Sequence, residues 1–345
     1  MDSSLLDTPY DHLTKLKITD AFWGNDCNKR LSEATIGLSQ FWTYYGKECA
    51  HALHDGGRHI ALRTHLDVVE LVHDIREGHH RDTIKKSLQS KLAETHENED
   101  ELLDNSIDLA ASLLLMCDCG SSSSHGFSGR AEVRWKAGLS LRGFLAIYFG
   151  QIPVLGHEKV KLERNFIGKN LERIAGIRIV WTDNLADHLR LIDDDTKVQV
   201  FHHASFLEYH RRSSESLFPP GLALETIQTL ALLFPSTDGE TKRWLSRFTE
   251  VDQRVAQCGR LKTDLRQIER FTFWRDRLVM LKQVFDEAQP RSLMQWWHDR
   301  RNGVQWYTFW VAVMVLGLTV FFGLVQSVEG ALQVWASFHA LDSAG

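Results

Sequence analysis

The feature that most constrains this chain is a long uncharged stretch near its C-terminus. No residue between Asn302 and Val328 is charged, and residues 306–325 read WYTFWVAVMVLGLTVFFGLV. Twenty helical residues span about 30 Å, the thickness of the hydrocarbon core of a bilayer. A core helix of a soluble protein, the alternative, does not need apolar residues on every face over about five turns. The stretch therefore predicts a transmembrane helix over 302–328 and a short tail over 329–345.

Aromatic residues and arginines border this stretch and predict its orientation. After Arg301 the chain contains no Lys or Arg, so the positive-inside bias places the preceding part in the cytosol. A tail without basic residues favours the endoplasmic reticulum or another endomembrane. The sequence thus predicts a single-pass, tail-anchored protein in contact with the lipid bilayer. Indole, phenol and guanidinium groups suit the headgroup region, and the expected membrane-interface residues are Trp296, Trp297, Arg300, Arg301, Trp306, Tyr307, Trp310 and Trp335.

The remainder of the chain is polar and close to neutral. All 40 Lys and Arg, and all but two of the 45 Asp and Glu, precede Asn302, which leaves this part at about −3. A nucleic-acid-binding protein needs a basic surplus, so no nucleic-acid partner is expected. Five cysteines without a CxxC pair indicate free thiols in a reducing compartment.

Helical periodicity predicts a mainly α body. Apolar residues recur at helical spacing in 29–54, 105–116, 140–149 and 222–234. An N-terminal helical region over 1–118 should end at a Gly/Ser-rich loop over 119–129, CGSSSSHGFSG, which is expected to be the main internal boundary. Residues 213–301 should form a helical hairpin, 241–258 with 261–288, followed by a basic juxtamembrane segment.

Residues 130–212 should form a small module of helices and a β-hairpin. The expected order is a helix over 169–175, an extended segment over 177–181, a helix over 183–189, and strands over 189–192 and 197–202. This is the order of a winged helix. The second helix would carry Asp183, Asp187 and His188, which repel phosphates, so the winged-helix-like module is expected to be structural or protein-binding.

Two groups of histidines and aspartates are candidate metal or acid–base sites, because imidazole and carboxylate groups hold metal ions that activate water. In each group an ordinary role is the alternative: exposed or core histidines in the first, and a helix cap with strand residues in the second. Neither group specifies a metal or a cofactor. The first group is His51, His54, His59, His65, His73, His79 and His80, with Asp55 and Asp74. The second is Asp183, Asp187, His188, His202 and His203.

The sequence favours a membrane-tethered protein-binding or scaffold protein, because it contains an anchor and no clear catalytic motif. Ser205, for example, lacks the GxSxG context of a serine hydrolase. This hypothesis predicts a body without a deep pocket lined by converging acids and histidines. The alternative is a membrane-bound, metal-dependent hydrolase, which requires one His/Asp group to lie within coordination reach of a common point. The sequence does not define the partner protein or the oligomeric state.

Three blocks of the chain resemble a group of proteins from filamentous ascomycete fungi that share a C-terminal transmembrane helix. The resemblance implies a fungal source and a shared membrane end. The resemblance implies no activity, cofactor or catalytic residue for this chain. The blocks are NLERIAGIRIVWTDNLADHLRL (170–191), VFHHASFLEYH (200–210) and WWHDRRNGVQWYTFWVAVMVLGLTVFFGLVQSVEGALQVW (296–335).

Overall fold

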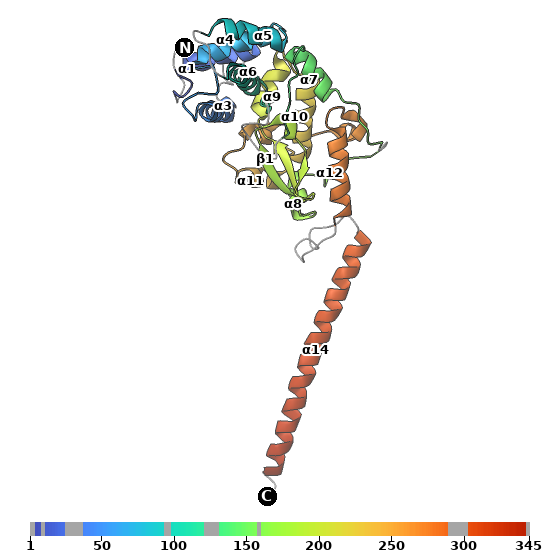
Figure 1. Cartoon of the computed structure of the whole chain (residues 1–345). Helices are drawn as coiled ribbons and strands as arrows, with labels where there is room; N and C mark the ends of the chain where they lie inside the picture. Colours follow the sequence, from blue (N-terminus) through green and yellow to red (C-terminus); the bar gives the residue numbers. More distant parts are fainter. Residues whose placement is uncertain are drawn as a thin grey trace. The chain divides into compact units, whose positions relative to one another are not determined.

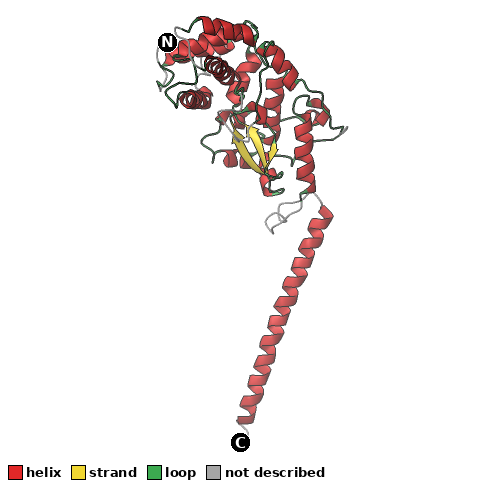
Figure 2. Ribbon diagram, in the orientation of Figure 1, coloured by secondary structure: helices red, strands yellow, loops and turns green. Residues whose placement is uncertain are grey.

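The computed structural model contains a mainly helical body and a separate long helix (Figures 1 and 2). The body comprises residues 1–172 and 176–287, and the second unit comprises 173–175 and 288–345. The structure describes residues 4–7, 11–24, 37–92, 98–120, 131–156, 160–288 and 303–342. The predicted interface residues Trp296, Trp297, Arg300 and Arg301, and most of the loop over 119–129, lie outside these ranges. The prediction of a mainly α fold with a small β-hairpin is confirmed.

Five helices form the N-terminal part of the body, at one end of it in Figure 1. The last of them, α6, is packed against α3, α4 and α5, and α1 lies on α4. Side chains start two of these helices: Asp11 accepts from the Thr14 amide before α1, and Thr64 with Asp67 forms a capping box before α4. The helices are α1 (His12–Trp23), α3 (Ser39–Ala52), α4 (His65–Arg76), α5 (Arg81–Ser90) and α6 (Glu99–Leu115).

Helix α6 is longer than its apolar pattern predicts. It begins at Glu99, whereas the sequence places its start near Asn105. The first turn carries Glu99, Asp100 and Glu101, and negative charges near a helix N-terminus are stabilised by the helix dipole. The acidic first turn therefore belongs to the helix, although it carries none of the apolar pattern that predicts the rest of it.

A three-stranded sheet lies in the second half of the body, with the order β1-β3-β2. Strands β2 (Leu191–Ile192) and β3 (Lys197–Phe201) are antiparallel, so the predicted hairpin is confirmed. Strand β1 (Arg178–Thr182) pairs with β3 in parallel, and Thr182 lies opposite Phe201. The carboxyl ends of β1 and β3 therefore meet at one edge of the sheet.

The helix expected over 183–189 does not form, and this departs from the winged-helix order. A single 3-10 turn, η2 (Leu185–Asp187), takes its place. The Asn184 side chain accepts from the Ala186 amide, and Leu189 has a positive φ of 60°. Because a non-glycine residue with positive φ cannot continue a right-handed helix, the chain leaves the turn and enters β2.

The helical hairpin expected over 241–288 is also wrong, because only two short α-helices form there. They are joined by 3-10 turns, and Gly259 between them has a φ of 92°. Glu225 accepts hydrogen bonds from the amides of Thr272, Phe273 and Trp274, all at 2.8 Å. These amides are therefore not used for the backbone hydrogen bonds of a continuous helix. The elements are α11 (Gly239–Leu245), η3 (Gln253–Gln257), η4 (Thr263–Leu265), η5 (Ile268–Arg270) and α12 (Arg275–Glu287).

Four further helices complete the body. The helices predicted near 140–149 and 222–234 are confirmed as α7 and α10, and Ser140 caps α7 by accepting from the Gly143 amide. Helix α9 packs on α10. The four are α7 (Leu141–Phe149), α8 (Gly168–Arg173), α9 (Ala204–Arg212) and α10 (Leu222–Leu233).

Residues on both sides of the expected boundary at 119–129 belong to the same packed body. The Leu185 amide donates to the Met116 carbonyl at 2.8 Å, and the Val133 amide to the Asp118 carbonyl at 2.7 Å. The ring of Trp23 in α1 lies 5.8 Å from that of Phe206 in α9. Because these contacts join the two sides, the loop does not divide the body.

Helix α14 (Gly303–Asp342) forms the second unit, and it contains an apolar section, Trp306–Ala336, of which none is buried. Its 31 residues are long enough to cross a membrane, since about 20 suffice. The hydroxyls of Thr308, Thr319 and Ser327 donate to carbonyls one turn back, so these three polar groups are paired within the helix. The predicted helix over 302–328 is confirmed from Gly303, and it continues to Asp342 within the expected tail. The predicted interface residues Trp306, Tyr307, Trp310 and Trp335 lie on it.

Candidate functional site

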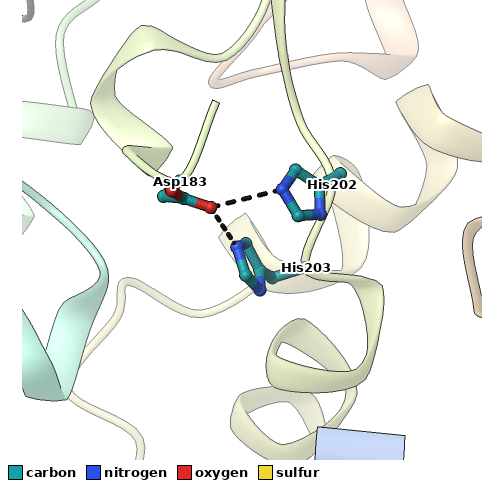
Figure 3. A group of neighbouring side chains, drawn as sticks. All are labelled: Asp183, His202 and His203. Atoms are coloured by element: carbon teal, nitrogen blue, oxygen red, sulfur yellow. Dashed lines mark hydrogen bonds and ion pairs between the residues drawn. The ribbon is translucent and has the colours of Figure 1, made fainter. Parts of the chain in front are cut away.

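Three of the five residues in the second His/Asp group come together at the edge of the sheet (Figure 3). Asp183 directly follows β1, and His202 and His203 directly follow β3. The parallel pairing of the two strands brings these positions side by side. The three side chains are called the Asp–His–His cluster below.

Both imidazole rings of this cluster direct a nitrogen at the same carboxylate oxygen. Oδ1 of Asp183 lies 2.7 Å from Nε2 of His203 and 3.2 Å from Nε2 of His202. The two rings stack with their centroids 4.1 Å apart. One ligand atom from each residue lies within 4.8 Å of the others, so the cluster meets the geometric requirement for a shared ion.

Burial and hydrogen bonding set the charges of the cluster. Burial works to raise the pKa of Asp183, but the hydrogen bonds from His202 and His203 outweigh it and hold the pKa well below its usual range. Burial lowers the pKa of His203 to about 4, against the opposing effect of Asp183. At neutral pH, Asp183 is therefore ionised and His203 is neutral.

The hydrogen bonds also indicate where the protons lie on the two rings. Nδ1 of His202 accepts from the Asp252 amide at 3.3 Å, so the neutral ring carries its proton on Nε2 and donates it to Asp183. Nδ1 of His203 is buried and has no hydrogen-bond partner. The 2.7 Å contact with the ionised carboxylate of Asp183 therefore places the proton of the neutral His203 ring on Nε2.

Asp187 and His188 lie outside the cluster, because η2 turns both into the body. Asp187 accepts from the Ala131 amide, the Asn184 side chain and Arg190. Nε2 of His188 lies 2.7 Å from the Thr229 hydroxyl, and its Nδ1 accepts from the Phe201 amide. Both side chains are fully buried, and only His188 reaches α10, so neither residue joins the other three predicted site residues.

The histidines of the first group do not converge on one point. His65 is buried, with its Nδ1 3.1 Å from the Tyr45 hydroxyl. Asp74, Glu77 and His79 offer ligand atoms within 4.8 Å of one another, but on the surface. His54 and His59 both contact Asp55, at 3.0 and 3.7 Å.

A cavity of about 350 Å³ extends from this last group to Asp183, and we call it the acidic pocket. No Lys or Arg is among the described residues that line it. The prediction of a body without a deep pocket lined by acids and histidines is therefore wrong. The ionisable side chains that line the pocket are Tyr44, Glu48, His51, His54, Asp55, His59, Glu101, Asp108, Asp118 and Asp183.

One wall of the acidic pocket was missed in the sequence. Glu101, Asn105, Asp108, Leu109 and Ser112 line it from α6. Their spacing of four, seven, eight and eleven residues places them on one face of the helix. The sequence therefore contains this helical spacing, but the spacing can be recognised only when α6 is known to begin before Asn105.

The thiols and Ser205 are poor candidates for a nucleophile. Burial raises the pKa of Cys49 and of Cys258 to about 12, and it also raises the pKa values of Cys117 and Cys119. These four thiols are free, as predicted, and protonated at neutral pH. The Ser205 hydroxyl donates to the Asp252 carboxylate at 3.2 Å.

No family model, curated protein or solved structure matches the chain. The resemblance to the ascomycete group, and the fungal source that it implies, stay predictions. The cluster and the pocket are therefore interpreted from their own chemistry.

Proposed function

We propose that the protein is a membrane-tethered binding protein, anchored by α14, with its body in the cytosol. The observation that carries this proposal is the unburied apolar section of α14, Trp306–Ala336. Arginines on the N-terminal side of this section and none after it support the orientation. The membrane is most simply an endomembrane.

The acidic pocket supports a partner protein that presents a basic side chain. Six of its described lining residues are Asp or Glu, and none of those described is Lys or Arg. Asp108 is already paired with Arg81 at 2.5 Å, whereas Glu101 lies exposed at the rim. The volume of about 350 Å³ is at the lower end of the usual range of about 300–1,000 Å³ for ligand pockets, which suits a single side chain.

A membrane-bound, metal-dependent hydrolase is the second candidate function. The observation that favours it is the convergence of Asp183, His202 and His203 beside the acidic pocket. Such chemistry depends on a bound metal ion that activates water. Binding of a partner protein needs no metal ion, so dependence on a metal ion distinguishes the hydrolase from the binding protein.

The proposed tethering and topology are tested with an N-terminal fluorescent fusion of the full chain and the same fusion lacking residues 303–342. The full chain is expected on internal membranes and the truncated chain in the cytosol. Protease added to sealed membranes should digest the body. A body that resists protease until detergent is added would contradict the orientation.

The proposed binding is tested with a labelled trilysine peptide and the full chain in detergent. Fluorescence anisotropy should report binding that weakens with salt. The double variant Asp55→Lys/Glu101→Lys should weaken binding at least tenfold. Glu250→Lys is the matched control, because Glu250 is exposed and does not line the pocket. Equal loss in the control variant would refute a role for the pocket.

A further inference from the structure

We propose that the Asp–His–His cluster binds one divalent transition-metal ion, of the class of Zn²⁺, through Asp183, His203 and His202. This inference goes beyond the proposed binding function and does not depend on membrane tethering. It concerns metal binding and not catalysis.

The distances in the cluster are close to those that a zinc ion requires. Zinc–nitrogen and zinc–oxygen bonds are about 2.0–2.2 Å long, so two ligand atoms around a tetrahedral ion lie about 3.3 Å apart. Oδ1 of Asp183 lies 2.7 Å from His203 Nε2 and 3.2 Å from His202 Nε2. An ion therefore fits between the three groups after outward shifts of a few tenths of an ångström.

The surroundings of the cluster favour a cation. Asp183 also lines the acidic pocket, so a fourth coordination position can open toward the cavity and its carboxylates. Asp183 forms an ion pair with Lys47, whose Nζ lies 3.9 Å from Oδ2 of Asp183. The Lys47 side chain is 63% exposed, so it can move into solvent when an ion arrives.

Proton positions distinguish the two histidines. A histidine that coordinates a metal ion through Nε2 cannot carry a proton on that nitrogen. In each ring the proton must therefore move from Nε2 to Nδ1, and the ring stays neutral. His203 can do so without breaking a hydrogen bond at Nδ1, because this nitrogen has no partner. His202 must give up the hydrogen bond that its Nδ1 accepts from the Asp252 amide. Asp183 and His203 should therefore contribute more to affinity than His202.

The proposal is tested by titrating Zn²⁺ and Co²⁺ into the full chain in detergent, after removal of metals with a chelator and without a histidine tag. Calorimetry should report one ion per chain. Bound Co²⁺ should give the visible absorption of a nitrogen- and oxygen-ligated site. Asp183→Asn and His203→Gln should each weaken Zn²⁺ binding at least tenfold, and His202→Gln should weaken it less.

Two further variants keep the test decisive if a buried variant does not fold. Lys47→Ala removes only an exposed cation and should tighten Zn²⁺ binding severalfold. Glu77→Gln/His79→Gln removes the exposed group that also has ligand spacing and should leave binding unchanged. The proposal is overturned if the folded wild-type chain binds no Zn²⁺ or Co²⁺, if Lys47→Ala has no effect, or if the control abolishes binding.

Discussion

Mild acid should destabilise the body strongly, because three histidines are buried in the neutral form. Burial lowers the pKa of His203 to about 4 and that of His210 to about 3, and it lowers the pKa of His188 far below its ordinary value. Each side chain is at most 3% exposed. Protonation therefore favours the unfolded chain at all three positions.

The sign and size of the effect follow from proton linkage. An unfolded histidine has a pKa of about 6.5, so between pH 6.5 and about 4 the unfolded chain binds protons that the folded chain does not. Stability thus falls as the pH falls through this window. From pH 7 to pH 5 each histidine contributes a loss of about 2 kcal/mol, or about 5–6 kcal/mol together. That loss is comparable to the whole stability of many domains, about 5–15 kcal/mol.

The assay is urea unfolding of the full chain in detergent at pH 7, 6 and 5, followed by near-ultraviolet circular dichroism. His210→Phe removes one titrating group and places a ring among those of Trp23, Phe206 and Phe218. Its loss of stability between pH 7 and pH 5 should be smaller than that of the wild type by about 2 kcal/mol. His79→Gln, at a half-exposed position, should keep the wild-type dependence. A wild-type change below about 1 kcal/mol would show that the three histidines are not held neutral by burial.

Other substitutions test individual contacts. Glu225→Gln should destabilise the body by about 1–3 kcal/mol in urea unfolding, because the amide group cannot accept from all three amides at residues 272–274; Glu240→Gln, at an exposed carboxylate that pairs with Lys169, should change stability by less than about 0.5 kcal/mol. Phe206→Ala should cost about 3–5 kcal/mol, because the fully buried ring contacts Trp23 and Phe41; an effect below about 1 kcal/mol would contradict this packing. Cys49, Cys117 and Cys119 should react with a thiol reagent only after urea is added, and rapid reaction in the native chain would show that they are not buried as described.

The parts of the fold that were predictable depend on local patterns. The helices α7 and α10 have a capping serine or a following proline and a continuous apolar stripe. Helix α14 is apolar on every face, and the length of its apolar section is typical of a membrane-spanning helix. The β-hairpin turn at Asp193–Asp195 was readable from three consecutive polar residues, and all three adopt positive φ.

The parts that were not predictable depend on contacts distant in sequence. Glu225 lies 47 residues from the Thr272 amide that it binds, and no local pattern in 241–288 shows this interaction. The parallel pairing of β1 with β3 brings Asp183 to His202 and His203, whereas the expected winged-helix order would also have gathered Asp187 and His188. The same difference in topology explains why three of the five predicted site residues converge and two are structural.

Alkaline extraction of membranes from cells that express the full chain distinguishes a chain anchored by α14 from one that is only attached at the surface. We expect the wild-type chain to stay in the membrane pellet. The variant Val315→Arg/Leu316→Arg, which adds about 2.5–3.5 kcal/mol per charge at the middle of the apolar section, should move the chain to the supernatant. Release of the wild-type chain by alkali without detergent would show that α14 does not anchor it.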